Sequence, residues 1–221
     1  MDQKVKSTDW IDLSYTISKN MVVWPGAPQP TLESLFEMKN GDFANSSAVH
    51  MSLHTGTHMD APLHFIEDGA DIAAIPLEVR TGKTRIIEAQ GERIQREDIA
   101  NFEELYGPIE EGERIFVKTT HSRKDWTSDP FMEDYVFFTT DAVKYLIEKQ
   151  ISVLGIDYLS VGGKRNNVHV HQLLLSQPIW IIEGLDLRHV QKGLYEAVIS
   201  PVKIAGAEAS PVSVLVRPLR S

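Results

Sequence analysis

The sequence predicts one mixed α/β domain that spans residues 1–221, and three observations support this fold class. The chain has 221 residues, which is the usual length of one domain and enough to bury a sizeable core. Its composition, 42% hydrophobic and 24% charged, is that of an average soluble globular protein. Strand and helix patterns alternate along the chain without an internal repeat, a low-complexity tract or a linker-like stretch.

Strands are expected to dominate the first half. Residues 10–18 alternate roughly as a strand does, whereas residues 21–30 hold three prolines and a glycine and are expected to form a loop. Residues 96–106 carry apolar side chains at helical spacing, which predicts a helix. Gly56 and Pro62 argue against a regular helix over residues 54–65, so we expect a loop that leaves a strand end. Further strands are expected over residues 31–38, 46–54, 84–90 and 114–119.

The second half has a clearer rhythm. Thr139 or Thr140 can cap a helix over residues 141–150, and a short buried strand is expected over residues 152–157. A helix over residues 168–177 and a strand over 178–185 follow. This strand–helix–strand order predicts a parallel unit. Strands are also expected in the tail, over residues 194–206 and 210–219.

Charge and cysteine content exclude several classes of function. The net charge is −9 and basic residues are scattered, which disfavours a nucleic-acid partner. The chain has no cysteine, so any metal site must use histidine and carboxylate ligands, which suit zinc, manganese or iron. No apolar run has the length of a membrane span, and no signal peptide is visible. We therefore expect a cytoplasmic protein without a membrane partner.

Four residues that could bind a metal or transfer a proton fall within a segment of eleven residues. They are His54, His58, Asp60 and His64. A hydrolytic metal needs imidazole and carboxylate ligands with one position left for water. Gly56 permits the turn that would bring His54, His58 and Asp60 together. His64 lies four residues further on and can transfer a proton without being a ligand. An isolated histidine is more often a core or surface residue, but the grouping favours a metal centre.

Other parts of the chain must complete such a site. Glu183 follows the apolar run 178–182, at the end of an expected buried strand, where functional groups often lie in α/β sheets. A capping or surface role for Glu183 is equally consistent with the pattern alone. His169 and His171 both lie on an expected helix, and periodicity does not choose between them.

The run from His54 to Phe65, HTGTHMDAPLHF, resembles the HxGTHxDxPxHF signature of the cyclase-family metal-dependent hydrolases, which include bacterial-type kynurenine formamidases and isatin hydrolases. Further segments match along most of the chain. They are Trp24-Pro25-Gly26, Gly155-Ile156-Asp157, the segment from His171, residues 183–187 and residues 210–212. The resemblance implies a compact domain of the swivelling β/β/α type, with a β-barrel-like core and flanking helices.

The resemblance also implies roles for single residues and for partners. Metal ligands would be His54, His58, Asp60, His171 and Glu183, with Asp60 bridging where two ions bind. His64 would be the catalytic acid and base. The implied cofactor is a divalent metal, one or two ions per subunit, with zinc expected first and manganese second. Members associate as homo-oligomers, so a dimer or tetramer is expected, with neighbouring subunits closing the pocket.

We expect hydrolysis of an amide C–N bond by metal-activated water, in an arylformamide such as N-formylkynurenine. Trp24 and Phe65 are candidates to bind the small-molecule substrate, although either can instead pack locally. Residues 122–131, with Trp126 and Phe131, are interpreted as a surface excursion rather than a cover over the pocket. Many formamidases read Pro-Gly-Asp where this chain has Pro25-Gly26-Ala27.

Two alternatives stay open at this point. One is a hydrolase of the same chemistry that acts on a cyclic amide of the isatin kind or on an ester. The other is a non-catalytic protein that binds a small molecule and holds a structural metal. A structural site would be saturated by protein ligands, and His64 beside the ligand set argues against it.

Overall fold

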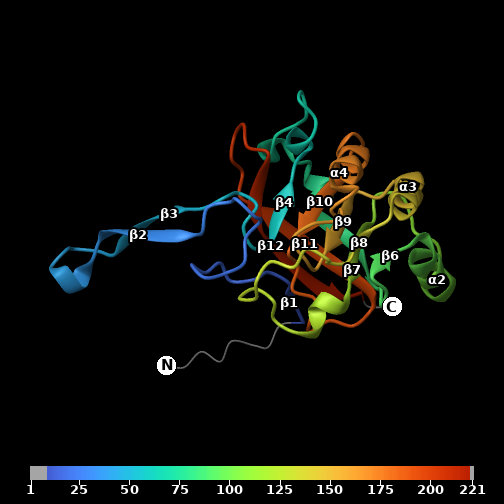
Figure 1. Ribbon diagram of the computed structural model, residues 1–221, viewed down its shortest axis with the longest axis horizontal. Helices are drawn as coiled ribbons and strands as arrows, with labels where there is room; N and C mark the ends of the chain where they lie inside the picture. The colour runs from blue at the N-terminus through green and yellow to red at the C-terminus, as the bar shows by residue number, and fades with distance from the viewer. Residues whose placement is uncertain (1–8, 220–221) are drawn as a thin grey trace.

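Seven strands close into a mixed β-barrel in the computed structural model, which describes residues 9–219 (Figure 1). They are β4 (His58–Asp60), β5 (Thr81–Glu88), β7 (Arg114–Lys118), β9 (Val153–Ile156), β10 (Trp180–Glu183), β11 (Gly193–Pro201) and β12 (Ala209–Pro218). The order around the barrel is β12-β11-β5-β7-β9-β10-β4, and β4 pairs back with β12. The short strand β1 (Ile11–Asp12) adds to the free side of β12. The barrel core that the family resemblance implies is therefore confirmed.

The barrel has a parallel part and an antiparallel part. Strands β5, β7, β9 and β10 run parallel, which confirms the parallel unit expected over residues 152–185. Parallel strands are covered on both faces, and β9 and β10 are accordingly buried at every position. Strands β11 and β12 pair antiparallel and alternate between buried and exposed residues.

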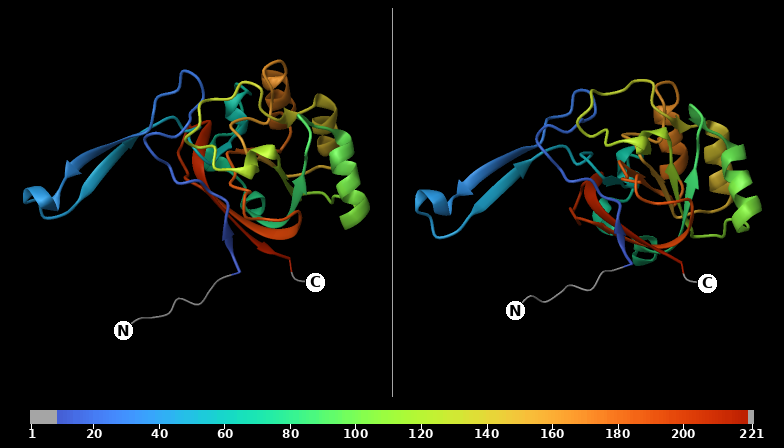
Figure 2. Two further views of the ribbon diagram at one scale, coloured as in Figure 1. Left: turned by 60° about the horizontal axis from the view of Figure 1, so that its bottom comes forward. Right: turned by 90° about the horizontal axis from the view of Figure 1, so that it is seen from below.

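Three helices cover the parallel strands, and both views of Figure 2 place them on one side of the barrel. They are α2 (Arg96–Tyr106), α3 (Thr140–Glu148) and α4 (Asn167–Leu175). Their apolar faces share a core with the outer faces of β7, β9 and β10. The side chain of Thr139 caps α3 by accepting a hydrogen bond from the backbone N–H of Ala142 at 3.3 Å. A one-turn helix, α1 (Leu77–Arg80), precedes β5.

The remaining elements are short or stand apart from the barrel. Strands β2 (Thr31–Phe36) and β3 (Ser46–His50) form a separate two-stranded sheet that projects from the body (Figures 1 and 2). Strands β6 (Arg93–Ile94) and β8 (Phe137–Phe138) form another. Single 3-10 turns are η1 (Met38–Asn40), η2 (Pro62–His64), η3 (Ile72–Ala74) and η4 (Thr120–Arg123).

Two expectations for the N-terminal half were wrong in part. Residues 54–65 are not only a loop, because they contain β4 and η2. β4 is three residues long and buried throughout, so its alternation of polar and apolar residues, His58-Met59-Asp60, is too short to predict a strand. Residues 10–18 form a strand only at β1, followed by an isolated bridge from Ser14 to Leu185. Among residues 9–219, no helix is long and apolar enough to cross a membrane.

Candidate metal centre

The predicted ligands meet where β4 closes the barrel between β10 and β12. β4 carries His58 and Asp60, and in its pairing with β10 His58 stands opposite Glu183. The loop before β4 brings His54 to the same place, and α4 supplies His171. Helix α4 leaves His169 exposed and buries His171. The structure therefore brings together all five residues, although their role as ligands stays a prediction.

Potential ligand atoms fall into two groups that share Asp60. His54, His58 and Asp60 each offer an atom within 4.8 Å of the others, and so do Asp60, His171 and Glu183. Nε2 of His171 lies 3.2 Å from Oε1 of Glu183 and 3.8 Å from Oδ2 of Asp60. Nε2 of His58 lies 3.4 Å from Oε2 of Glu183. A shared central carboxylate is the arrangement that can serve one ion or two.

Backbone carbonyls orient two of the histidine rings. Nδ1 of His58 lies 3.0 Å from the carbonyl oxygen of Gly56, and Nδ1 of His171 lies 2.8 Å from that of Asn167. A carbonyl oxygen only accepts, so each Nδ1 carries the hydrogen and donates it. Nε2 of each ring is then left with its lone pair facing the carboxylates. Metal-binding histidines are commonly held this way.

Three buried atoms of the cluster have no hydrogen-bond partner among residues 9–219: Nε2 of His58 and both carboxylate oxygens of Asp60. Nδ1 of His54 lies 3.0 Å from Oδ1 of Asp60, but the two groups are not aligned as a hydrogen bond requires. An unpaired buried carboxylate costs several kcal/mol, so buried charges are normally paired or coordinate a metal. The donor set and its unpaired atoms therefore fit a divalent cation.

The electrostatics of the cluster also favour a cation. Burial raises the pKa of Asp60, but the neighbouring His54, His58 and His64 lower it by more, and the net direction is downward. Burial likewise raises the pKa of Glu183, as does Asp60, yet its histidine neighbours bring it below the ordinary value. Burial lowers the pKa of His54, and Asp60 reverses this and raises it to about 9. Protons and a metal ion thus compete for the same atoms.

Two glycines allow the loop before β4 to approach the end of β10. Gly56 has φ +66°, in the left-handed region, and a Cβ there would lie 3.3 Å from the side chains of Ile17 and Met21. Gly184 has φ +71°, and its Cβ would lie 2.5 Å from the carbonyl oxygen of Gly56. Thr57 ties the two segments by donating a hydrogen bond of 2.6 Å to the carbonyl oxygen of Gly184. Only a residue without a side chain fits at position 184.

His64 lies beside the ligand cluster on the turn η2. Its ring centre is 4.2 Å from that of His54 and 5.9 Å from that of His171. Burial lowers the pKa of His64, although Asp60 acts in the opposite direction. Neither ring nitrogen makes a hydrogen bond to another described residue, so the ring is available for proton transfer to a bound molecule.

A cavity of about 230 Å³ opens onto the cluster. His54, His64, His171 and Glu183 lie in its wall together with both predicted substrate-binding residues, Trp24 and Phe65. Phe65 also stacks on His171, with ring centres 4.6 Å apart, so it both lines the cavity and supports a predicted ligand. Trp24 is 36% exposed and contacts Phe131 edge-on at 5.4 Å.

The interpretation of residues 122–131 as a surface excursion was wrong for its aromatic residues. Trp126 is buried and packs edge-on against Tyr15 and Tyr158, with ring centres 5.2 and 4.9 Å away. The contact of Phe131 with Trp24 brings the end of this segment to the wall of the cavity. Aromatic pairs across separate loops gave no periodic signal in the sequence.

Three residues of the site were missed by sequence reasoning. Oε1 of Glu208 lies 3.4 Å from Nε2 of His54. Ser160 and Asn167 line the cavity, and the hydroxyl of Ser160 donates a 2.9 Å hydrogen bond to Oδ1 of Asn167. All three lie outside the histidine-rich segment, next to turns where polar residues are common, so their position gave no functional signal.

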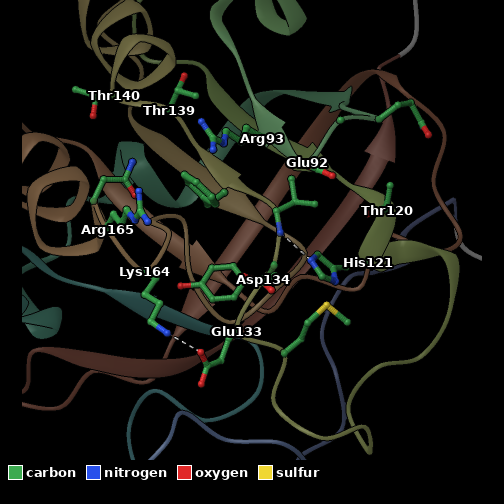
Figure 3. Close-up of a pocket in the computed structure, with 17 residues that line it drawn as sticks. Glu92, Arg93, Thr120, His121, Glu133, Asp134, Thr139, Thr140, Lys164 and Arg165 are labelled. Carbon is green, nitrogen blue, oxygen red and sulfur yellow. Dashed lines mark hydrogen bonds and ion pairs between the residues drawn. The ribbon is translucent and has the colours of Figure 1, made fainter.

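A larger hollow of about 1150 Å³ lies elsewhere, beside β6 and β8 (Figure 3). Charged groups of both signs share its rim, including the ion pair of Lys164 and Glu133 at 2.6 Å. His121 also faces it and accepts a hydrogen bond from the backbone N–H of Val136. Neither group of potential metal ligands belongs to this hollow, which therefore differs from the smaller cavity in lacking a ligand cluster among the described residues.

Comparisons with known proteins agree with this geometry. The family model Cyclase, described as "Putative cyclase", matches residues 11–162. A kynurenine formamidase of Bacillus cereus is 31% identical over 217 residues, which cover 97% of this chain and all of that protein. A solved structure of a potential metal-dependent hydrolase with cyclase activity is 33% identical, with a TM-score of 0.82 and coverage of 96% of this chain and 98% of that chain.

An isatin hydrolase from Labrenzia aggregata, bound to benzyl benzoate, shares the fold. It has a TM-score of 0.82 at 22% identity and covers 96% of this chain and 94% of its own. The match to the family model, the formamidase relative and the common barrel all support membership of one family. The chain belongs to the Cyclase family.

Proposed function

We propose that this protein is a metal-dependent amidohydrolase that cleaves the C–N bond of an arylformamide such as N-formylkynurenine. The observation that carries the proposal is the buried carboxylate of Asp60, which has no hydrogen-bond partner among the described residues and lies among His54, His58, His171 and Glu183. The relationship to proteins named kynurenine formamidase supports the choice of substrate class. β1 and the barrel strands belong to one sheet that draws on segments from Ile11 to Pro218, which supports the proposal of a single domain over residues 1–221.

Five side chains would hold the metal: His54, His58, Asp60, His171 and Glu183. When bound, a divalent ion supplies Lewis acidity, which polarises an amide carbonyl and lowers the pKa of a water molecule. Histidine and carboxylate ligands suit zinc, which we propose first, and manganese second. The shared position of Asp60 between two ligand groups is compatible with one or two ions.

His64 would handle the proton in this reaction. Its ring lines the cavity beside the proposed ligands, and burial lowers the pKa of the imidazole, which favours the neutral form. A neutral ring nitrogen can take a proton from the attacking water as the new C–O bond forms. The same nitrogen then gives that proton to the amide nitrogen as the C–N bond breaks. The products are a carboxylic acid, formate for a formamide, and a free aryl amine.

The cavity wall would select a flat aromatic substrate. Trp24 and Phe65 stand on the wall with Leu159, and an aryl ring can stack or pack edge-on against them. Ser160 and Asn167 add polar groups on the same wall. The volume of about 230 Å³ suits one small aromatic molecule rather than a polymer. As in the sequence-based expectation, we propose a cytoplasmic homo-oligomer with a small-molecule substrate.

Hydrolysis assays test the substrate. Metal-loaded protein is given N-formylkynurenine, isatin and a simple aryl ester in parallel, with a His64→Ala protein as the control for contaminating activity. Preferred turnover of N-formylkynurenine, lost in the His64→Ala protein, is the expected result. Preferred turnover of isatin or the ester would keep the hydrolase and overturn the formamidase. A metal-loaded protein that hydrolyses none of these amides or esters would contradict the proposed function.

A further inference from the structure

Asn167 is the first residue of α4 and lines the cavity beside the predicted ligands. It precedes His171 by one helical turn, so the two side chains lie on the same face of α4. Its backbone carbonyl oxygen, 2.8 Å from Nδ1 of His171, orients that ring. The side-chain amide of Asn167 is therefore next to the cluster, and the reaction proposed above gives it no specific role.

The oxygen of the Asn167 amide already has a partner. The hydroxyl of Ser160 donates a 2.9 Å hydrogen bond to Oδ1 of Asn167. Ser160 is buried, and its oxygen also accepts a 3.3 Å hydrogen bond from the backbone N–H of Gly162. Because an N–H only donates, the hydroxyl hydrogen of Ser160 is left for Oδ1. This chain of hydrogen bonds fixes which end of the amide is the oxygen.

The nitrogen of the amide is the end left for a ligand. Among residues 9–219, Nδ2 of Asn167 has no hydrogen-bond partner. Gly162 packs closely against the residue, since a Cβ on Gly162 would lie 2.6 Å from Cα and 2.7 Å from Oδ1 of Asn167. The side chain is thus held in place and offers two N–H donors. A donor fixed in this way in a cavity wall suits an oxygen that accepts hydrogen bonds.

The cavity wall favours an uncharged acceptor over a carboxylate. Of the described residues that line the cavity, none is a lysine or an arginine, and Glu183 adds a carboxylate of its own. A ligand carboxylate is bound most strongly by charge-assisted hydrogen bonds from such cations. The neutral amide of Asn167 instead matches a ketone oxygen, which accepts hydrogen bonds without carrying a charge.

We propose that the Asn167 amide determines specificity by donating a hydrogen bond to an uncharged carbonyl oxygen on the aryl ring of the substrate. This inference rests on the proposed function, because the substrate occupies the same cavity. The cavity is small, about 230 Å³, and both His64 and Asn167 line it. The carbonyl must therefore lie close to the amide that is cleaved. Among arylformamides, the site selects those with a ketone ortho to the formamide nitrogen, as in N-formylkynurenine.

Two matched substrates and one variant test the inference. ortho-Acetylformanilide has the ketone, and formanilide lacks it. Asn167→Asp keeps the shape of the side chain and the acceptor for Ser160, but replaces the two N–H donors by an oxygen that only accepts. An aspartate in the first turn of a helix is favoured, so the metal-loaded variant should be folded.

In Asn167→Asp protein, the kcat/KM of ortho-acetylformanilide should fall at least about 10-fold more than that of formanilide, because only the ketone loses a hydrogen bond. The intrinsic reactivity of each substrate is the same with both proteins and cancels in this comparison. A change at the metal would affect both substrates and cancels as well. Asn101→Asp, at an exposed position on α2, is the matched control and should keep the wild-type selectivity.

Equal losses for the two substrates, or no loss for either, would overturn the inference and leave the hydrolase in place. N-formylanthranilate, which has a carboxylate where the ketone stands, should be a poorer substrate of the wild-type protein than ortho-acetylformanilide. Faster turnover of N-formylanthranilate would show that the wall selects an anion and would also overturn the inference. A wild-type protein that hydrolyses none of the three formamides would instead contradict the proposed function, on which the inference rests.

Discussion

Nε2 of His58 on β4 lies 3.4 Å from Oε2 of Glu183, which stands directly opposite it on the neighbouring strand β10. The two residues are far apart in the sequence and meet only because β4 closes the barrel between β10 and β12. The ligand cluster is thus a product of barrel closure. A metal that binds both residues would bind the folded chain and not the unfolded one, so metal binding and stability should be coupled.

Asp60→Asn should abolish metal-dependent stabilisation. The substitution keeps the shape of the side chain but removes the charge that both ligand groups share. We expect metal affinity to fall at least about 100-fold and turnover to fall with it. The metal-free variant should be less stable than the metal-free wild-type protein, because the contact of His54 with Asp60 at 3.0 Å loses its negative partner. Thermal unfolding with and without added zinc measures both effects. Glu88→Gln, at an exposed position on β5, is the control and should retain the zinc response.

His64→Gln should separate metal binding from proton transfer. The variant is expected to keep its bound metal, while kcat falls about 10²–10⁴-fold, the range that general acid–base catalysis supplies. His169→Gln is the matched control, since His169 is exposed on α4 and away from the cavity wall. Steady-state kinetics and elemental analysis of the same samples give the comparison. Full activity in His64→Gln protein would remove His64 from the mechanism.

Stability should fall at mildly acidic pH through His121. Burial lowers the pKa of this imidazole from 6.5 to about 4, so it stays neutral in the folded protein. Its Nε2 accepts a 3.1 Å hydrogen bond from the N–H of Val136, which protonation would break. Between pH 6.5 and about 4, the His121 imidazole is protonated in the unfolded chain but stays neutral in the folded chain. The contribution is therefore complete above pH 6.5 and is lost as the pH falls to about 4, by at most about 3 kcal/mol.

His121→Gln should flatten that part of the pH dependence. Other histidines titrate as well, so the quantity to compare is the difference in unfolding free energy between variant and wild-type protein at pH 7 and at pH 4.5. The exposed His189, changed to Gln, should leave the wild-type profile unchanged. An unaltered profile in His121→Gln protein would show that this ring titrates normally.

Gly184→Ala should damage the fold and the site together. Its φ of +71° disfavours a side chain by about 1–2 kcal/mol. The added Cβ would also meet the carbonyl oxygen of Gly56 at 2.5 Å, so a total loss of about 2–5 kcal/mol is expected. Gly112→Ala has a similar φ of +78° with nothing within 4 Å, and should lose only the backbone part. Denaturant unfolding measures both, and equal losses would show that the approach of Gly56 to Gly184 is not tight.

The sequence predicted the helices better than the strand that carries the chemistry. Residues 96–106 coincide with α2, because an amphipathic helix displays its buried face at regular spacing. β4 was missed because all three of its residues are buried, and two of them, His58 and Asp60, are polar. An alternation of only three residues is too short to predict a strand, and polar residues that face a functional site also leave no apolar run. Its position in the barrel depends on β10 and β12, which the local sequence does not encode.

The residues of the site likewise differ in how well the sequence predicted them. The segment from His54 to His64 was identified because several ligand-type residues stand close together in the chain. Glu208 and Ser160 were missed because they reach the site through the pairing of distant segments. The choice of His171 over His169 came from family resemblance, and the structure gives the physical reason. The two residues lie on different faces of α4, and the face with His171 is buried at the cluster while His169 is exposed.

Calorimetric titration of chelator-treated wild-type protein with zinc tests the central claim most directly, with Asp60→Asn protein titrated in parallel. We expect one or two ions per chain in the wild-type protein, recovery of N-formylkynurenine hydrolysis as the sites fill, and neither in the variant. Wild-type protein that binds neither zinc nor manganese, or Asp60→Asn protein that binds as tightly as wild-type, would contradict a metal centre at this cluster.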